Sequence, residues 1–163
     1  MLEGEFRYLL PYGGTGSIEG SLLPNDSLYA DRNRTSVAWR HSGQLSDAVS
    51  IRSDVNYVSD SAYFTDLGTD LNLSNTTHQE RVGEINWHRG SWNLLGRAQG
   101  FQTIDPSIVD YDKPYSRLPQ LLLSGGSTVQ RGLEPRLSTE LAWFQRKIED
   151  GSGPEINGGR YRL

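Results

Sequence analysis

The stretch that decides the fold is Thr35–Gly68, TSVAWRHSGQLSDAVSIRSDVNYVSDSAYFTDLG. Apolar and polar side chains alternate in its second half. The apolar set is Val49, Ile51, Val55 and Tyr57. The polar set is Ser50, Arg52, Asp54 and Asn56. A period of two predicts a strand with one apolar side and one wet side. A turn rich in Ser, Gly and Asp, residues 42–47, joins this strand to an earlier one, so the stretch predicts a hairpin followed by a polar, aromatic loop.

Composition excludes several classes of protein. The chain has 163 residues, enough for one domain, of which 35% are hydrophobic and 18 are glycine. No segment approaches the roughly 20 apolar residues of a membrane-spanning helix, but the strands of a membrane barrel alternate and keep mean hydropathy low. The net charge of −4, with acids and bases interspersed, argues against a nucleic-acid partner. The sequence has no cysteine, hence neither a disulfide nor a thiolate metal site.

The same periodicity recurs along the chain and predicts an all-β fold. We expect an antiparallel up-and-down meander of about eight strands, with the start of a ninth at residues 161–163. The connections are predicted to be short after the first, third, fifth and seventh strands and long after the others. Short turns on one rim and long loops on the other are typical of outer-membrane barrels.

A soluble β-sandwich also has alternating strands, so the pattern alone fits both architectures. Aromatic residues near strand ends favour the barrel, because aromatic girdles lie at both lipid interfaces. They are Tyr8, Trp39, Tyr57, Trp87, Trp92 and Trp143.

The connections contain the most specific motifs. The first is Leu23-Pro24-Asn25-Asp26, and the second is Ser59-Asp60 with Tyr63, Phe64 and Asp66. The third is Tyr115-Ser116-Arg117-Leu118-Pro119-Gln120. In this order and spacing, together with Glu5–Leu9 and Trp39–Gly43, they resemble the lipopolysaccharide-assembly family LptD, also called Imp or OstA. The resemblance runs from Glu3 to about Arg162.

The resemblance implies that residues 1–163 are part of a large outer-membrane β-barrel of a Gram-negative bacterium. The piece would be the N-terminal half of the barrel. The periplasmic jellyroll, the first and the closing strands, the lateral gate between them and the family's disulfide cysteines would be missing. The implied function is transport of lipopolysaccharide and its insertion into the outer leaflet. The implied partners are the LptE lipoprotein plug, lipopolysaccharide, the periplasmic Lpt bridge acting through the jellyroll, and outer-membrane lipid.

Within this barrel the two faces receive different roles. The lipid-facing residues are predicted to be Val49, Ile51, Val55, Leu94 and Leu141. The lumen-facing residues are predicted to be Ser50, Arg52, Asp54, Asn56, Arg97 and Glu140. The motif residues are interpreted as structural: Pro24 ends a strand, Asn25 and Asp26 form a turn, and Arg117 pairs with Asp60 or Asp66.

Catalytic chemistry is not expected. His41, His78 and His88 lack the spacing of metal ligands, and no nucleophile motif is present, so we predict no enzyme, no cofactor and no metal. Acidic loop residues could instead bind divalent cations that bridge lipopolysaccharide phosphates. They are Asp26, Asp31, Asp60, Asp66, Asp70, Asp105, Asp110 and Asp112.

Two alternatives remain open at this point. One is a self-contained eight-stranded barrel that serves as a small porin or adhesin. The other is a soluble sandwich that binds carbohydrate. The N-terminal segment MLEGEFRYLL has no signal-peptide pattern, so a signal for export is expected upstream.

Overall fold

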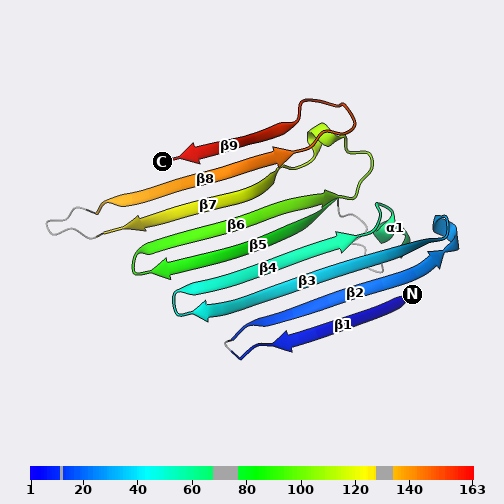
Figure 1. Cartoon of the computed structure of the whole chain (residues 1–163), viewed down its shortest axis with the longest axis horizontal. Coiled ribbons are helices and arrows are strands. Elements are labelled where there is room, and N and C mark those ends of the chain that lie inside the picture. Colours follow the sequence, from blue (N-terminus) through cyan, green and yellow to red (C-terminus); the bar gives the residue numbers. More distant parts are fainter. Residues whose placement is uncertain (12, 68–76, 128–133) are drawn as a thin grey trace.

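The computed structural model describes residues 1–11, 13–67, 77–127 and 134–163. A single sheet dominates it, and its 9 strands pair in the order of the sequence (Figure 1). The strands are β1 (Leu2–Leu9), β2 (Thr15–Asp26), β3 (Arg32–Ser46), β4 (Val49–Val58), β5 (His78–Arg89), β6 (Trp92–Thr103), β7 (Ser116–Gly126), β8 (Arg136–Arg146) and β9 (Ile156–Arg162). Among the described residues, three short helices lie in connections: η1 (Ser27–Tyr29), α1 (Tyr63–Leu67) and η2 (Asp110–Asp112). The predicted all-β, up-and-down meander is confirmed, and the ninth strand has 7 residues.

The hairpin of β3 and β4 is longer than the sequence suggested. Residues 42–46 were predicted as part of a turn, but they continue β3, and Ser46 pairs with Val49 across a tight turn at Asp47 and Ala48. The prediction missed this because it took Gly43 as a turn residue, whereas Gly43 pairs with Ile51 within the ladder. A glycine can sit inside a strand as well as in a turn.

The predicted alternation of connections holds only in the middle of the sheet. The connections β3–β4 and β5–β6 are tight turns, whereas residues 59–77 and 104–115 form long connections on the opposite rim. The connection β7–β8, residues 127–135, was predicted to be short and is as long as β8–β9, residues 147–155. We call the rim with β2–β3, β4–β5, β6–β7 and β8–β9 the loop rim, and the other the turn rim.

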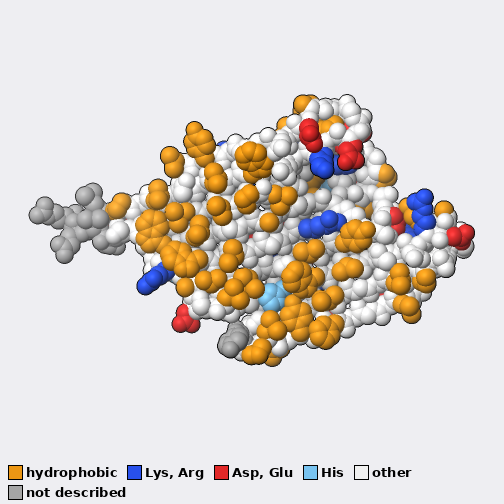
Figure 2. Space-filling model, viewed as in Figure 1, with side chains coloured by type: hydrophobic (Ala, Val, Ile, Leu, Met, Phe, Trp, Pro, Cys, Tyr) orange, Lys and Arg blue, Asp and Glu red, His pale blue; other side chains and the backbone are white. Residues whose placement is uncertain are grey.

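Strand register places the apolar side chains on one continuous face. Trp39 lies opposite Val55, Ile51 opposite Ile85, and Leu121 opposite Leu141. Many of them stay exposed: Phe6 is 63% exposed, Ile85 50% and Leu141 54%. Figure 2 shows hydrophobic side chains spread across the strands of this face. No second layer of described residues packs on this face, which we call the apolar face; a β-sandwich would cover it.

Buried residues gather instead on the other side of the sheet, near the loop rim. Val58, Tyr63 and Ile104 form a small core that is at most 5% exposed, and Phe64 and Leu67 of α1 pack against it. This core fastens the β4–β5 connection to the sheet and is far too small to stabilise nine strands. No described helix is long and apolar enough to cross a membrane.

Three aromatic rings on the apolar face lie over glycines of the neighbouring strand. The opposed pairs are Tyr8 with Gly16, Trp92 with Gly125, and Trp143 with Gly159. A Cβ atom at Gly16 would overlap the Tyr8 ring and come within 2.7 Å of the Arg40 carbonyl oxygen. The ring position matters because the Tyr8 hydroxyl accepts from Trp39 Nε1 at 3.0 Å and bonds His41 Nδ1 at 2.9 Å.

We therefore expect Gly16→Ala to displace the Tyr8 ring and to destabilise the protein by about 1–3 kcal/mol, as overpacking does. Gly4→Ala is the matched control, because a Cβ atom there meets nothing within 4 Å. Urea unfolding in lipid vesicles measures both variants. Equal free energies of unfolding for the two would show that the ring does not need this glycine.

Candidate functional site: the polar face and the loop rim

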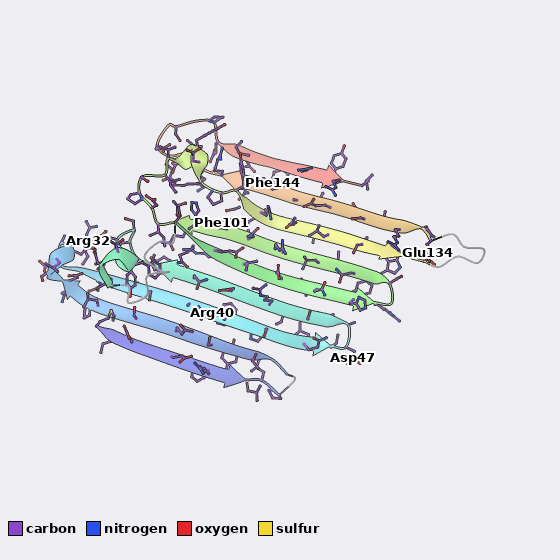
Figure 3. All side chains as sticks on the ribbon, turned by 180° about the vertical axis from the view of Figure 1, so that it is seen from behind. Arg32, Arg40, Asp47, Phe101, Glu134 and Phe144 are labelled. Carbon is purple, nitrogen blue, oxygen red and sulfur yellow. The ribbon has the colours of Figure 1, made fainter. Side chains whose placement is uncertain are left out.

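A ladder of charged and amide side chains crosses the face opposite the apolar one. Arg52 lies opposite Glu84, Glu84 opposite Arg97, and Arg97 opposite Gln120. Arg97 Nε donates to Glu84 at 2.7 Å, Arg52 is 3.9 Å from Glu84, and Gln120 Nε2 donates to Glu140 at 2.5 Å. These ion pairs and the amide of Gln120 link β4 to β8, so this polar face is suited to meet water or polar ligands. Figure 3, turned by 180° from the view of Figure 1, looks onto this face and labels Arg40, Phe101 and Phe144.

Arg34 is the centre of the loop rim near β3. Its side chain is only 2% exposed, and its guanidinium donates to both Asp60 oxygens at 3.0 and 2.8 Å. It also donates to Asp26 at 3.2 Å and to Asp66 at 2.9 Å. Its Cζ atom lies 4.6 Å from the centre of the Tyr29 ring. One cation thus joins the β2–β3 and β4–β5 connections.

The carboxylate of Asp60 is held in its charged form. Burial by itself raises the pKa of Asp60, but the hydrogen bonds from Arg34 and Ser59 outweigh it and hold the pKa below its usual value. Ser59 also closes the strand end, since its hydroxyl accepts from Thr35 N at 3.0 Å and its own N–H donates to the Thr35 carbonyl at 2.9 Å.

A second buried arginine, Arg146 at the end of β8, packs against the β6–β7 connection. Its Cζ atom lies 4.7 Å from the Tyr111 ring centre and 4.3 Å from the Tyr115 ring centre. Nearby, the Asp110 carboxylate accepts from the backbone N–H groups of Glu149 at 2.6 Å and Asp150 at 3.0 Å. Asp150 returns the contact by accepting from Asp110 N at 2.8 Å. The β6–β7 and β8–β9 connections are therefore clasped by two reciprocal aspartates.

This clasp should open in acid. Lys113 and the N–H groups of Glu149 and Asp150 lower the pKa of Asp110, and Ser152 together with the Asp110 N–H lowers the pKa of Asp150 to about 2. A lowered folded-state pKa gives stability that is full above the ordinary value of about 3.9 and is lost as the pH falls through the folded value. We expect hydrogen-exchange protection of the Glu149 and Asp150 amides to fall between about pH 4 and pH 2. The step should be smaller in Asp150→Asn, and protection that stays constant down to pH 2 would contradict the account.

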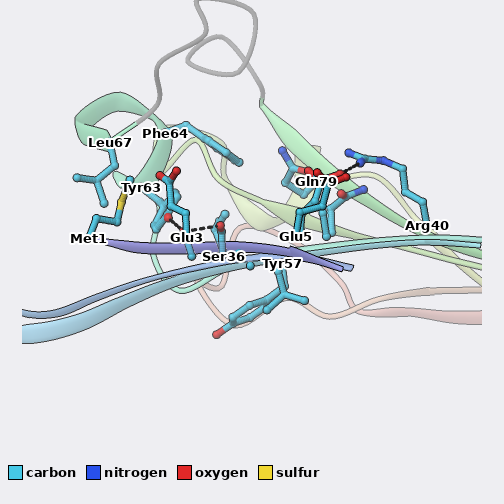
Figure 4. Close-up of a pocket in the computed structure, with 18 of the residues that line it drawn as sticks. Met1, Glu3, Glu5, Ser36, Arg40, Tyr57, Tyr63, Phe64, Leu67 and Gln79 are labelled. Carbon is cyan, nitrogen blue, oxygen red and sulfur yellow. Dashed lines mark hydrogen bonds and ion pairs between the residues drawn. The ribbon is translucent and has the colours of Figure 1, made fainter. Parts of the chain in front are cut away.

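A hollow of about 610 Å³ lies on the polar face beneath α1 (Figure 4). Its apolar end is formed by Met1, Phe64 and Leu67, and its charged end includes Glu5 and Arg40. Figure 4 shows α1 on this side of the strands, whereas Tyr57 points to the opposite side. The Tyr63 hydroxyl bonds Ser21 Oγ, which bonds Ser36 Oγ at 2.8 Å and so fixes α1 over β2 and β3.

Strand register puts the residues predicted to face lipid and those predicted to face the lumen on opposite faces of the sheet. Val49, Ile51, Val55, Leu94 and Leu141 lie on the apolar face; Ser50, Arg52, Asp54, Asn56, Arg97 and Glu140 lie on the polar face. Contact of these faces with lipid or with a lumen stays a prediction.

The first motif differs from the expectation. Pro24 does not end β2, which continues to Asp26 through a register shift after Leu23. Proline is tolerated at a bulge because it has no N–H to donate to the ladder. Asn25 has φ 48°, and Asp26 accepts from Leu28 N at 3.0 Å, which caps η1.

The third motif also contains a bulge, with the register shifting between Arg117 and Gln120 around Leu118 and Pro119. The predicted pairing of Arg117 with Asp60 or Asp66 is wrong. Arg117 donates to Gln99 at 3.1 Å, and Arg34 holds both aspartates. Sequence reasoning overlooked Arg34 and Arg146. Their only signal was an arginine at a strand end near several acidic or aromatic loop residues.

Five of the eight acidic residues in the predicted cation set bind protein groups. Asp26, Asp60 and Asp66 bind Arg34, Asp110 binds Lys113, and Asp105 accepts from Ser107. Within residues 1–11, 13–67, 77–127 and 134–163, no group of three acidic or histidine side chains could hold a metal ion. Asp70 of the predicted cation set lies outside the described residues.

This construction defines a class of protein. One sheet with sequential antiparallel strands, an uncovered apolar face and a charged opposite face has the design of a piece of β-barrel wall.

The comparisons with known proteins identify the family. A family model described as LptD, LPS transport system D, matches residues 32–162. The LPS-assembly protein LptD of Alcanivorax borkumensis is 40% identical over 152 residues, covering 93% of this chain and 20% of the relative. The proteins of the same name from Acinetobacter baumannii and Nitrosococcus oceani are 38% and 45% identical, covering 98% and 77% of this chain and 20% and 17% of their own lengths. The chain belongs to the LptD family, and it spans about a fifth of the length of these relatives.

Proposed function

We propose that this chain forms part of the wall of an outer-membrane translocon that inserts lipopolysaccharide into the outer leaflet. The observation that supports this proposal best is the match of this chain to the LptD family. Its sheet also has one uncovered apolar face, as a wall in contact with lipid requires. The relatives are named LPS-assembly proteins, and the family model is described as an LPS transport system.

The two faces have different tasks in this proposal. The apolar face seals the wall against lipid, and the polar face lines a water-filled lumen. The charge ladder from Arg52 to Glu140 would then meet the sugar-bearing part of lipopolysaccharide and the LptE plug. The loop rim would face the cell exterior, since long loops of such barrels are extracellular.

The division of labour along the whole protein is also part of the proposal. Residues 1–163 would be the N-terminal half of the barrel domain, without the closing strands. A periplasmic jellyroll elsewhere in the protein would connect to the Lpt bridge that delivers lipopolysaccharide.

Depletion of the gene product tests this function. We expect lipopolysaccharide reactive with antibody on intact cells to fall while the total in the cell envelope is maintained. A small porin or adhesin would instead change solute entry or attachment. Depletion that alters these and leaves surface lipopolysaccharide unchanged would overturn the proposal.

A further inference from the structure

We propose that Arg81 on β5 is the centre of a site, on the apolar face, that binds the phosphate group of a membrane lipid. The inference rests on the proposed function, because it requires that this face lie against lipid. It adds a specific lipid contact on the outside of the wall, on the opposite side from the charge ladder.

The position of Arg81 is unusual for a charged residue. It lies opposite Val55 on β4 and Gly100 on β6, so it shares the face of Val55 and Ile85. Strand alternation puts only one other Lys, Arg, Asp or Glu of the described strands on this face, namely Arg89 at the turn end of β5. A charge on a lipid-facing surface is costly and is therefore expected to have a function.

The partners of the Arg81 guanidinium among the described residues are neutral. Its Nε donates to the Asn56 carbonyl at 3.0 Å, and its Nη2 donates to Gln102 Oε1 at 2.7 Å. Its Cζ atom lies 5.4 Å from the centre of the Tyr57 ring. No carboxylate of the described chain forms an ion pair with it. An arginine has five N–H donors, so these two bonds leave three for an anion.

The strands hold Arg81 in place. Backbone pairing of β4 with β5 ends at Val55 and Arg81, and beyond it the side chain of Gln102 takes over. Gln102 Nε2 donates to the Val58 carbonyl at 2.6 Å, and Gln102 Oε1 accepts from Val58 N at 3.2 Å. Arg81 is thus bound to atoms of both β4 and β6. Fixing the donor before the ligand arrives lowers the entropic cost of binding.

There is room for a ligand next to the guanidinium. Gly100 lies directly opposite Arg81, and Gly83 lies two residues along the same face. A Cβ atom at Gly83 would meet nothing within 4 Å, and one at Gly100 would meet only Ser116 Oγ at 3.5 Å. The surface beside the free N–H groups is therefore open.

The chemistry of the site favours a lipid phosphate. Arginine binds phosphate through two parallel N–H bonds, and such charge-assisted bonds are about twice as strong as neutral ones. Arg81 is three residues from the loop end of β5, about 10 Å along the strand. That depth suits the boundary between head groups and acyl chains in the leaflet at the loop rim. The occupant is therefore a phosphate-bearing lipid of that leaflet.

The experiment uses the whole protein purified from its membrane in mild detergent and stripped of lipid. Its unfolding temperature is measured at increasing concentrations of lipid A, of dephosphorylated lipid A and of inorganic phosphate. We expect Arg81→Gln to weaken binding of lipid A about tenfold, the loss of one charged hydrogen-bonding group. Arg89→Gln, on the same face, should bind lipid A like the wild type. Dephosphorylated lipid A should bind the wild type about tenfold more weakly, and inorganic phosphate should not stabilise it.

Equal binding of the two lipid forms by the wild type would overturn the inference, as would stabilisation by inorganic phosphate alone. Neither result depends on how well a variant folds. Quenching of tryptophan fluorescence by lipids with brominated acyl chains separates the two proposals. Without quenching, the proposed function fails; with quenching but no preference for phosphate, only the role of Arg81 fails.

Discussion

Arginine in place of Ile51 should block membrane assembly, whereas arginine in place of its neighbour Ser50 should be tolerated. Ile51 lies between Gly43 and Ile85 on the apolar face, and Ser50 lies on the polar face opposite Asn86. An arginine facing lipid near the midplane costs roughly 2–4 kcal/mol, and a lumen-facing one costs little. Val55→Arg should have a smaller effect, because Val55 lies opposite Arg81, near the head-group boundary, where the cost falls to about 0–1 kcal/mol. The fraction of protein recovered in the outer membrane measures the effect.

Ser50 is a better control than Asn56, although both lie on the polar face. Asn56 Nδ2 donates to Asp54 at 2.8 Å and to the Glu80 carbonyl at 3.3 Å. Replacing it removes these bonds as well as changing the charge. Equal losses for Ile51→Arg and Ser50→Arg would contradict the assignment of the two faces.

The second large effect is expected at Arg34. Arg34→Met leaves Asp26, Asp60 and Asp66 close together without their cation, and Asp26 and Asp60 have side chains less than 10% exposed. Breaking a buried ion pair by removing one partner costs about 3–5 kcal/mol. We expect the β2–β3 and β4–β5 connections to separate and to become sensitive to protease, with a lower free energy of unfolding.

A matched control is Arg40→Met, because Arg40 forms an exposed pair with Glu19 at 2.7 Å. Exposed pairs contribute only about 0.2–1 kcal/mol. Adding Asp60→Asn to Arg34→Met should recover part of the loss, since one unpaired carboxylate is then gone. If Arg34→Met and Arg40→Met unfold alike, Arg34 does not join the connections.

Sequence reasoning predicted those features that depend on neighbouring residues. Alternation in Val49–Val58 and in β8 predicted strands, faces and the open meander, because a strand repeats every two residues. It failed where several segments meet. The pairing of Arg34 with three aspartates joins residues up to 40 positions apart, and no local pattern encodes it.

Local signals misled in two places for a physical reason. Gly43 and Pro24 indicate turns in most contexts, yet Gly43 faces Ile51 inside a ladder and Pro24 lies at a bulge. In both cases pairing with the neighbouring strands outweighed the local preference for a turn. The LptD-like motifs were informative because they occur in a fixed order, although the residues that stabilise the loop rim, Arg34 and Arg146, lie outside them.

Tryptophan quenching tests the central claim most directly, because the chain contains 4 tryptophans and strand register puts all of them on the apolar face. They are Trp39, Trp87, Trp92 and Trp143. In vesicles, lipids with brominated acyl chains should quench their fluorescence strongly, and iodide in the water should quench it weakly. Strong quenching by iodide with little effect of brominated lipid would show that this face meets water, and the account of a membrane wall would be wrong.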